Sequence, residues 1–355
     1  MSQPIKLMGM VDPHVHLRDM EWAHKATFAS ETAAALAGGY WAVFDMPNTP
    51  PNTFTRAALD QKLAAFQAGA VCDWGVYFGA SREGNWAEYL QVIADTCGLK
   101  IYNNPTTGNL FITDQAIREQ HYRTWHGVIA VHAEEDVIPA VLELVRKYRR
   151  WTHFCHISSV TEMAYLIEAK REGLPISIGV TPHHLYLSQD DLPQLGSRGL
   201  MKPELKTPAD CRALWQAIKD GWVDVVESDH APHTLPEKMS DRPPYGVPGL
   251  ETTLPLMGLA LHEGRISLEQ VVALLTTGSQ RIFKITPPSE TYTLVDFDDS
   301  SIIESQNLRT ACGWSPFEGW RGYGRVLEVW IRGQKVFDGE RVLVPNGFGQ
   351  RVICG

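Results

Sequence analysis

The segment VIAVHAEEDVIPAVLELVRKYRRWTHFCH, residues 128–156, decides the fold. It begins and ends with short apolar runs, at 128–131 and 152–155, and an amphipathic stretch lies between them. Each apolar run is followed at once by a histidine, His132 and then His156. Strands that alternate with helices form parallel β-α-β units, and the carboxyl ends of parallel strands lie at one edge of the sheet. The segment therefore predicts two strands that carry their histidines to the same edge.

The same alternation runs through the first two thirds of the chain. Eight apolar runs are expected to be strands, at 7–11, 41–44, 74–78, 99–102, 128–131, 152–155, 176–180 and 223–226. Helix-like stretches lie between most of them, at 26–37, 56–67, 86–94, 136–147 and 161–172, and Thr207-Pro208-Ala209-Asp210 predicts the start of a helix over 211–218. Eight such strands predict an α/β fold of the (β/α)8 TIM-barrel type. The competing doubly wound sheet is disfavoured because no GxGxxG follows the first strand.

The sequence changes character after Pro287. Segments that alternate like strands and are punctuated by glycine follow at 292–295, 326–331, 334–337 and 341–344. We therefore expect a barrel over residues 1–289 and a small β-rich appendage over residues 290–355.

Composition excludes several classes of protein. The 355 residues include 32 Lys and Arg against 41 Asp and Glu, a formal net charge of −9, which argues against nucleic acid or an anionic membrane as the main partner. No run approaches 18 apolar residues, and the first residues lack the pattern of a secretory signal. The six cysteines are scattered without a CxxC pair, which favours reduced thiols in the cytoplasm.

Residues able to bind a metal recur where the predicted strands end. They are His14, His16, Lys100, His132, His156 and Asp229. In a TIM barrel these positions converge on one mouth, and side chains two apart in an extended chain face the same way. Taken alone, each could be a structural or surface group, but the set predicts a site for zinc or a similar divalent metal. The other histidines are expected to be structural, with His24, His121, His126, His153 and His262 at the surface or packed against helices.

Lys100 is unusual because it lies in an apolar strand, Gly98-Leu99-Lys100-Ile101-Tyr102. An ammonium group that points into a barrel costs several kcal/mol unless it is paired. A neutral amine can instead react with carbon dioxide and become a carbamate, whose two oxygens could bridge two metals. The alternative is a lysine whose ammonium reaches the rim.

The chain resembles dihydroorotases of the amidohydrolase superfamily over nearly its whole length, and especially the dihydroorotase domain of the animal multifunctional pyrimidine enzyme. The segments that carry the resemblance are HVHLRD at 14–19, MPNT at 46–49, GLKIY at 98–102, VHAE at 131–134, CHI at 155–157, PHHL at 182–185, SDHAPH at 228–233, PGLET at 248–252 and SPFEGW at 315–320. The HxH pair alone is weak evidence, whereas the ordered set is strong.

The resemblance implies a metal centre and a reaction. His14, His16 and Asp229 would hold one zinc ion, His132 and His156 a second, and carboxylated Lys100 would bridge the two. Divalent metals make bound water nucleophilic near neutral pH, and Asp229 would act as the general base and acid. The implied reaction is the reversible cyclisation of N-carbamoyl-L-aspartate to L-dihydroorotate in pyrimidine biosynthesis. A homodimer and an association with aspartate carbamoyltransferase are left open by the sequence.

The resemblance also implies the groups that bind substrate. Arg18 would grip the substrate carboxylate with its planar guanidinium, and Asn48 and His233 would join it. Thr106 would belong to a loop, 103–108, that closes over the substrate. Taken alone, these residues could be a surface cation, a turn residue and part of a plain Pro/Gly loop.

Three positions depart from the family pattern. Only 13 residues precede His14, so the β appendage is expected to lack its N-terminal part. Lys202 stands where relatives often have a substrate-binding arginine, which is expected to weaken or alter that contact. Close animal relatives have a glutamate near the position of Gly179 that is associated with an additional metal, so Cys155 is expected to lack that glutamate as a partner and a third ion is not expected.

Two other functions remain open from the sequence. One is a related cyclic-amide hydrolase of the allantoinase or dihydropyrimidinase type, although Arg18 argues against the latter because its substrate has no carboxylate. The other is a non-catalytic scaffold for aspartate carbamoyltransferase, which the retention of all six metal-site residues disfavours.

Overall fold

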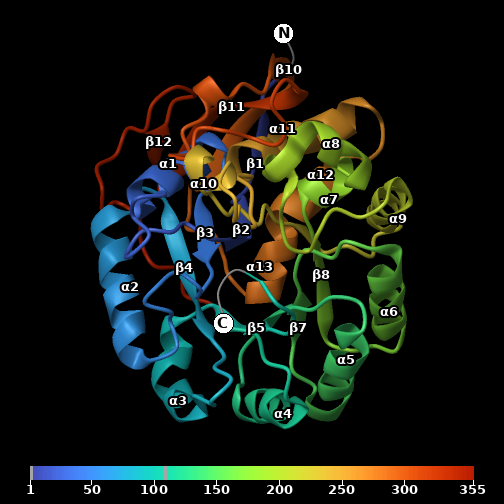
Figure 1. Ribbon diagram of the computed structural model, residues 1–355. Helices are drawn as coiled ribbons and strands as arrows, with labels where there is room; N and C mark the ends of the chain where they lie inside the picture. Colours follow the sequence, from blue (N-terminus) through green and yellow to red (C-terminus); the bar gives the residue numbers. More distant parts are fainter. Residues whose placement is uncertain (1–2, 107–109) are drawn as a thin grey trace.

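The computed structural model describes residues 3–106 and 110–355. Eight parallel strands follow one another in chain order around a barrel (Figure 1): β2 (Val11–Val15), β3 (Ala42–Asp45), β4 (Asp73–Gly79), β5 (Gly98–Tyr102), β6 (Ile129–His132), β7 (Thr152–Phe154), β8 (Ile176–Val180) and β9 (Val225–Val226). A parallel bridge between Val15 and His230 joins the first strand to the segment after the last, and the His16 N–H donates to the His230 carbonyl at 2.7 Å. The predicted TIM barrel is therefore confirmed.

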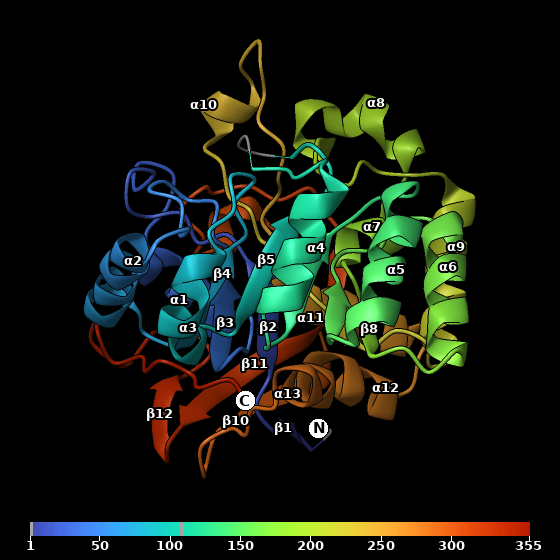
Figure 2. The same cartoon turned by 90° about the horizontal axis from the view of Figure 1, so that it is seen from below.

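Helices surround the barrel (Figures 1 and 2). The larger ones are α1 (Phe28–Ala37), α2 (Arg56–Gly69), α4 (Gln115–Thr124), α5 (Val137–Tyr148), α6 (Val160–Arg171), α9 (Pro208–Lys219), α11 (Leu250–His262) and α13 (Gly278–Phe283). Helix α5 buries Ile138, Val141, Leu142 and Val145, the spacing of a helix with one apolar face against the core. Thr207 and Asp210 form the expected capping box of α9, with Pro208 in the first turn.

Shorter helices lie on the loops. They are α3 (Tyr89–Val92), α7 (Pro182–Tyr186), α8 (Leu192–Leu195), α10 (Leu235–Lys238) and α12 (Leu268–Val272). The helix predicted over 86–94 is broken into α3 and two flanking 3-10 turns, at Trp86–Glu88 and Ile93–Asp95.

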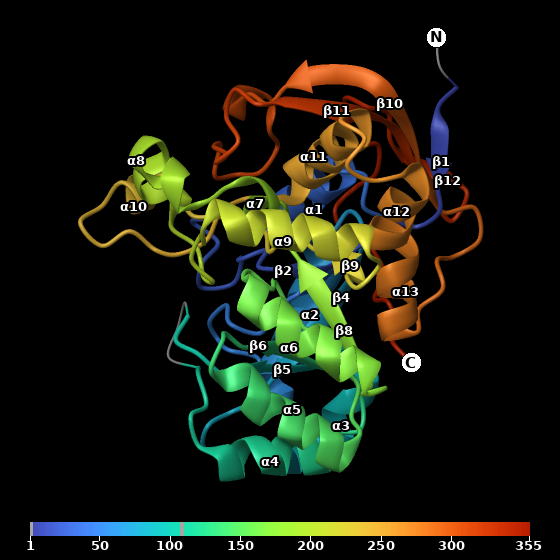
Figure 3. The same ribbon diagram turned by 90° about the vertical axis from the view of Figure 1, so that its right-hand side faces the viewer.

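A second sheet is antiparallel, in the order β1 (Ile5–Leu7), β10 (Tyr292–Ile302), β11 (Arg321–Ile331) and β12 (Gln334–Phe337). Strands β10 and β11 arch over α11 (Figure 3). The approach is close at Gly258 of α11, where a Cβ atom would lie 2.0 Å from the Tyr323 carbonyl oxygen. The expected strand at 341–344 is only an isolated bridge between Phe337 and Val342.

The N-terminal segment corrects two expectations. The single strand predicted at 7–11 is in fact β1 of the antiparallel sheet followed by β2 of the barrel, and the expectation that the sheet lacks an N-terminal strand is wrong. Gly9 makes the bend between them with φ of 67°, and a Cβ atom there would lie 2.3 Å from the side chain of Pro287. The boundary between residues 1–289 and 290–355 stays a prediction, with β1 lying in the sheet formed mainly by the later part.

The cysteines also differ from the expectation. Cys97 and Cys354 form a disulfide that ties the last residues to the start of β5, whereas Cys72, Cys155, Cys211 and Cys312 are free. Two cysteines 257 positions apart in the sequence give no local pattern from which the pair could be predicted. None of the helices in the described residues is long and apolar enough to cross a membrane.

Candidate metal centre and substrate pocket

One cavity at the carboxyl ends of the barrel strands brings the predicted residues together. It is lined by His14, His16, Arg18, Asn48, Lys100, Thr106, His132, His156, Lys202 and Asp229, together with Tyr102, Ala231, Tyr245 and Gly246. The space between these side chains is narrow, about 30 Å³. Of the eleven site residues predicted from the sequence, only His233 is outside this lining.

The first group of candidate ligands is His14, His16 and Asp229. The Asp229 Oδ1 atom lies 3.4 Å from His14 Nε2 and 3.2 Å from His16 Nε2. A tetrahedral ion with bonds of about 2.1 Å holds its ligand atoms about 3.4 Å apart. The pKa of both imidazoles is lowered because burial disfavours the charged ring, and nearby Lys100 contributes at His14 and Arg18 at His16. Neutral imidazoles are the form that binds metal, so these atoms fit one ion.

The second group is His132 and His156. His132 Nδ1 and His156 Nε2 face one another at 3.2 Å, again the separation of two ligands on one ion. Burial, His132 and Lys100 lower the pKa of His156 well below its usual value. The His14 and His156 ring centroids are 5.0 Å apart, so the two groups are neighbours.

Lys100 lines the same cavity as the two groups and does not reach the rim, whereas its place as a bridge between them stays a prediction. Its side chain is fully buried, and its Nζ is 3.4 Å from Cys155 Sγ and 5.2 Å from the centre of the Tyr102 ring. In the part of the chain that the structure describes, Lys100 has no carboxylate within ion-pair distance. A buried ammonium without a counter-ion is costly, whereas a carbamate at this position would add the anionic oxygens that the second group lacks.

Hydrogen bonds fix the orientation of two candidate ligands. His16 Nδ1 lies 2.7 Å from Asn48 Oδ1, and His132 Nε2 lies 3.0 Å from Glu134 Oε1. In each case the ring N–H donates to the oxygen, and the opposite nitrogen is left with a lone pair that faces the centre. Asn48 therefore orients His16, and its predicted contact with substrate stays a prediction.

Glu227 is a buried carboxylate behind the centre that the sequence analysis missed. Its Oε1 accepts the His156 backbone N–H at 2.6 Å and lies 3.6 Å from His14 Nδ1, while its Oε2 lies 3.0 Å from His153 Nε2. His156 has φ of 38°, an uncommon conformation that this hydrogen bond supports. His153 is fully buried, so a place at the surface is wrong, whereas its expected packing against a helix agrees with its ring contact to Phe283 of α13 at 6.2 Å between centroids. The available signal was a charged residue that directly follows the apolar run at 223–226, two positions before Asp229.

Glu227 also explains Gly179. A Cβ atom on Gly179 would lie 2.5 Å from Glu227 Oε1, so the glycine leaves room for a carboxylate that comes from the neighbouring strand. His14, Cys155 and Glu227 offer ligand atoms within 4.8 Å of one another. Cys155 thus lacks a glutamate at position 179, as expected, but has Glu227 as a carboxylate neighbour that the sequence analysis did not anticipate, and the number of ions stays a prediction.

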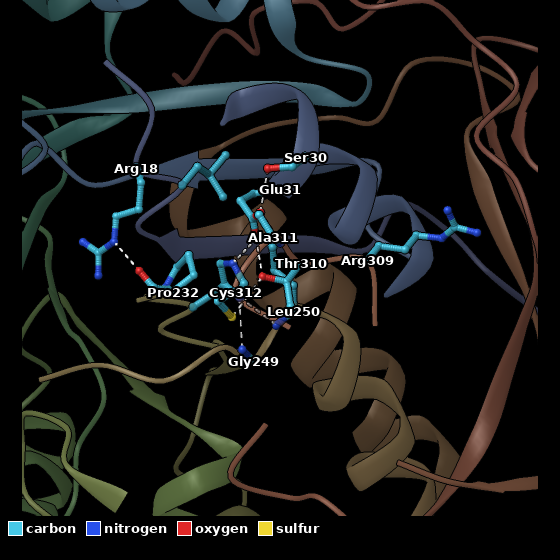
Figure 4. A network of polar contacts seen from close by, with 12 residues as sticks. Arg18, Ser30, Glu31, Pro232, Gly249, Leu250, Arg309, Thr310, Ala311 and Cys312 are labelled. Carbon is cyan, nitrogen blue, oxygen red and sulfur yellow. Dashed lines mark hydrogen bonds and ion pairs between the residues drawn. The ribbon is translucent and has the colours of Figure 1, made fainter. Parts of the chain in front are cut away.

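A second polar network supports the segment that carries Asp229. Buried Glu31 of α1 accepts hydrogen bonds from Thr310 Oγ1 at 2.6 Å and from the Ala311 N–H at 3.0 Å (Figure 4). Its Oε2 also lies 2.8 Å from Nε2 of His230, the residue that follows Asp229. Burial opposes ionisation of Glu31, but these hydrogen bonds, led by that of His230, lower its pKa below the usual value. The network ties the Asp229 segment to the loop between β10 and β11.

Arg18 is held on one side and free on the other. Its Nε donates to the Pro232 carbonyl at 3.0 Å (Figure 4), and its Nη2 lies 3.0 Å from His233 Nε2. Its Nη1 is buried without a hydrogen-bond partner among the described residues. Burial lowers the pKa of Arg18 to about 10, so the group remains a cation near neutral pH. An arginine with one free N–H edge at a cavity can bind an anion.

His233 lies behind Arg18 and does not line the cavity. Its Nδ1 is 3.0 Å from Lys25 Nζ, and its pKa is strongly lowered by burial and by Arg18 and Lys25. In this arrangement His233 positions Arg18, and its direct contact with substrate stays a prediction.

Two further predicted residues lie at the rim. Lys202 Nζ is 2.5 Å from Glu204 Oε1 and 4.9 Å from the centre of the Tyr245 ring. Thr106 lines the cavity, whereas residues 107 and 108 of the predicted closing loop lie outside the described residues.

The sequence of the chain is similar to those of several known proteins. No family model matches the chain. It is 41% identical over 354 residues to the multifunctional protein CAD of Squalus acanthias, covering 98% of this chain and 16% of that relative. It is 34% identical over 374 residues to the dihydroorotase of Halobacterium salinarum, covering 96% of this chain and 88% of that enzyme. The chain thus spans a small part of the multifunctional relative and most of the archaeal one.

Solved structures share the fold. The L-hydantoinase (dihydropyrimidinase) of Arthrobacter aurescens superposes with a TM-score of 0.94 at 24% identity, covering 99% of this chain and 89% of that one. The inactive dihydroorotase-like domain of a CAD-like multifunctional protein from Chaetomium thermophilum has a TM-score of 0.82 at 22% identity, covering 98% and 99%.

The fold and the cluster of candidate ligands define a TIM barrel with a candidate metal centre at the carboxyl ends of its strands, the fold also found in the hydantoinase structure. Within that class, the chain belongs to the dihydroorotase family.

Proposed function

We propose that this protein is a zinc-dependent dihydroorotase that interconverts N-carbamoyl-L-aspartate and L-dihydroorotate in pyrimidine biosynthesis. The observation that carries the proposal is the convergence of six candidate ligand residues on one cavity that also holds the free edge of Arg18. The metal-site residues alone suit any cyclic-amide hydrolase. The buried guanidinium adds the preference for a substrate that carries a carboxylate.

The donor set divides into two metal positions. His14, His16 and Asp229 would hold one zinc ion, and His132 and His156 the other, with carboxylated Lys100 contributing an oxygen to each. When bound, the ions would supply Lewis acidity and make water nucleophilic near neutral pH. The ligand-atom separations of 3.2 to 3.4 Å support this division.

The protein's own groups then bind the substrate and move the proton. In hydrolysis, the ring C–N bond breaks, the carbonyl carbon gains the water oxygen, and the ring nitrogen needs a proton. Asp229 faces the cavity, so its carboxylate can accept the proton from water and deliver it to the departing nitrogen. Arg18 Nη1 would bind the substrate carboxylate and set the distance from Asp229 to the amide, with Asn48, Lys202 and His233 supporting that contact. Because the cavity is narrow, Thr106 would have to move for the ring to enter.

Two alternatives make different predictions. An enzyme of the dihydropyrimidinase or allantoinase type would not depend on a substrate carboxylate. A scaffold for aspartate carbamoyltransferase would bind fewer than the two zinc ions per chain that the enzyme needs. This alternative is tested because an inactive dihydroorotase-like domain has the same fold. The buried Lys100, which has no ion-pair partner among the described residues, favours a metal centre over a scaffold because a carbamate on this side chain would supply an anionic metal ligand beside the histidines.

The test is an assay of the purified protein on dihydroorotate, dihydrouracil and allantoin, together with its zinc content. We expect turnover of dihydroorotate far above that of the other two and about two zinc ions per chain. Faster turnover of dihydrouracil or allantoin would show that the proposed substrate is wrong. A folded protein without metal or turnover would favour the scaffold for aspartate carbamoyltransferase.

The cellular setting is a further part of this proposal. We place the enzyme in the cytoplasm, on the basis of its acidic composition and the pathway. The Cys97–Cys354 pair is an uncommon feature for that compartment. A homodimer and a complex with aspartate carbamoyltransferase are the assemblies to test by size-exclusion chromatography of the protein alone and with the carbamoyltransferase.

A further inference from the structure

A second cavity lies at the opposite end of the barrel from the metal centre. Its volume is about 440 Å³, within the range of small-molecule sites. It is lined by residues at or just before the amino ends of strands β5, β6 and β7, such as Gly98, Val128 and Trp151, and by Ile282 of α13. Cys354 and Gly355 form another wall, beside the end of α13 (Figure 3). The Gly355 N–H donates to the Phe283 carbonyl at 3.1 Å, and Cys354 is joined to Cys97. We call this space the basal cavity.

The charge of the basal cavity is opposite to that of the protein. Arg149, Arg150, Arg281 and Lys284 line it, and none of its lining residues is Asp or Glu within the described part of the chain. Arg281 is neutralised by Asp224 at 2.6 Å. The other three have no carboxylate within ion-pair distance among the described residues. A chain with a net charge of −9 therefore presents, at one small cavity, three cations that have no ion-pair partner among the described residues.

The two arginines with free charge are held in place by neutral groups. Arg149 donates to the Gly173 carbonyl at 2.9 Å, and Arg150 donates to the carbonyls of Tyr122 and Arg123 at 3.2 and 3.4 Å. Carbonyl contacts orient a guanidinium without cancelling its charge. Such a group keeps N–H donors for an anion, and phosphate is a frequent partner of arginine because two of its oxygens can accept hydrogen bonds from one guanidinium.

Aromatic surface completes the cavity. Trp151 is 37% exposed, and its Nε1 donates to Ser177 Oγ at 3.2 Å, which fixes the indole ring. Trp125 is buried in another part of the lining and donates to the Val128 carbonyl at 3.0 Å. A fixed, half-exposed indole beside cations offers a stacking surface for a flat ring.

We propose that the basal cavity binds a phosphorylated small molecule with a planar ring, the chemistry of a nucleotide. The phosphate would be bound by Arg149, Arg150 and Lys284, and the ring would lie against Trp151. The site is separate from the metal centre, because barrel chemistry is performed at the carboxyl ends of the strands and this cavity lies at their amino ends. The proposal does not depend on the reaction assigned above.

The test is isothermal titration of the full-length protein with UMP and AMP, and with uridine, adenosine and inorganic phosphate as partial ligands. We expect at least one nucleotide to bind with one site per chain, and to bind at least tenfold more tightly than its nucleoside or phosphate. The affinity should fall with added salt, because charge contributes to binding. Absence of binding by both nucleotides at millimolar concentration overturns the proposal, and equal binding of phosphate alone removes the part played by the ring.

Two variants locate the binding. Arg149→Gln with Lys284→Gln should weaken nucleotide binding at least tenfold, and Trp151→Leu should weaken it several-fold while leaving any phosphate binding unchanged. The matched control is Arg325→Gln with Arg341→Gln, which removes the same charge from exposed residues on strand β11 and just after strand β12 of the antiparallel sheet. If the control weakens binding equally, general charge and not the cavity is responsible. Should the first double variant fail to fold, Lys284→Gln alone, at an exposed position, provides the same comparison.

Discussion

Arg18 is the residue whose replacement separates a dihydroorotase from other cyclic-amide hydrolases. Its Nε and Nη2 are engaged by Pro232 and His233, and Nη1 alone is left for a ligand. Arg18→Lys keeps the positive charge but removes the planar group that can approach a carboxylate along one edge. The substitution therefore tests recognition more than overall charge.

The size of the effect follows from the lost hydrogen bond. A hydrogen bond between charged groups in a buried site contributes about 1.5 to 3 kcal/mol. Loss of one such bond in the transition state corresponds to a decrease in kcat/KM of roughly 10- to 150-fold. The change applies only to a substrate that has the carboxylate.

The assay compares the hydrolysis of dihydroorotate with that of dihydrouracil, which lacks the carboxylate. We expect kcat/KM for dihydroorotate to fall within the range given, and kcat/KM for any residual dihydrouracil hydrolysis to change by less than about threefold, since no charged hydrogen bond is lost. Arg325→Lys, an exposed substitution on β11, is the control for the change of residue type. An equal loss on both substrates, with zinc content and thermal stability unchanged, would refute the role of Arg18 in binding the carboxylate.

Three other predictions address the metal centre and the stability of the fold. Lys100→Ala should abolish dihydroorotate hydrolysis and reduce bound zinc, because the bridging anion is lost; a variant that keeps both metals and activity would remove the carbamate from the account. Glu227→Gln should leave the fold intact but weaken zinc binding by roughly 10- to 100-fold, measured by competition with a chelator. The reason is that the carboxylate facing His14, His153 and the His156 N–H loses its charge. Unchanged zinc affinity would contradict this. Burial lowers the pKa of His121 to about 4, so the unfolded chain binds a proton first as the pH falls below about 6.5, and folding becomes less favourable. The wild type should therefore lose about 2 kcal/mol more unfolding free energy than His121→Gln between pH 7.5 and 5 in urea titrations, and equal losses would exclude His121 as the cause.

The barrel and the candidate ligands could be predicted because both depend on local sequence order. Short apolar runs between amphipathic stretches define the strands, and a residue just after a strand has a known place at the mouth. His132 and His156 were predictable for this reason although 24 residues separate them. Lys100 was predictable because a charged residue in an apolar strand needs a specific explanation.

Contacts between distant segments could not be predicted in the same way. Glu227 belongs to the centre because Gly179, on the adjacent strand, leaves space for it, and a single sequence does not reveal which side chain fills that space. The contact of His153 with Glu227 joins residues 74 positions apart, so no local pattern predicts it. The sequence does not separate β1 from β2, because only residues 8–10 lie between them and the bend there is made by the positive φ of Gly9.

The most direct test of the metal centre is a crystal structure of the purified, metal-loaded protein with anomalous scattering recorded at the zinc absorption edge. The account predicts two anomalous peaks, one within about 2.2 Å of ligand atoms of His14, His16 and Asp229 and one equally close to His132 and His156. Electron density for a carboxylate on Lys100 should extend between the two peaks. A single peak, or an unmodified Lys100 that points away from both, would contradict it.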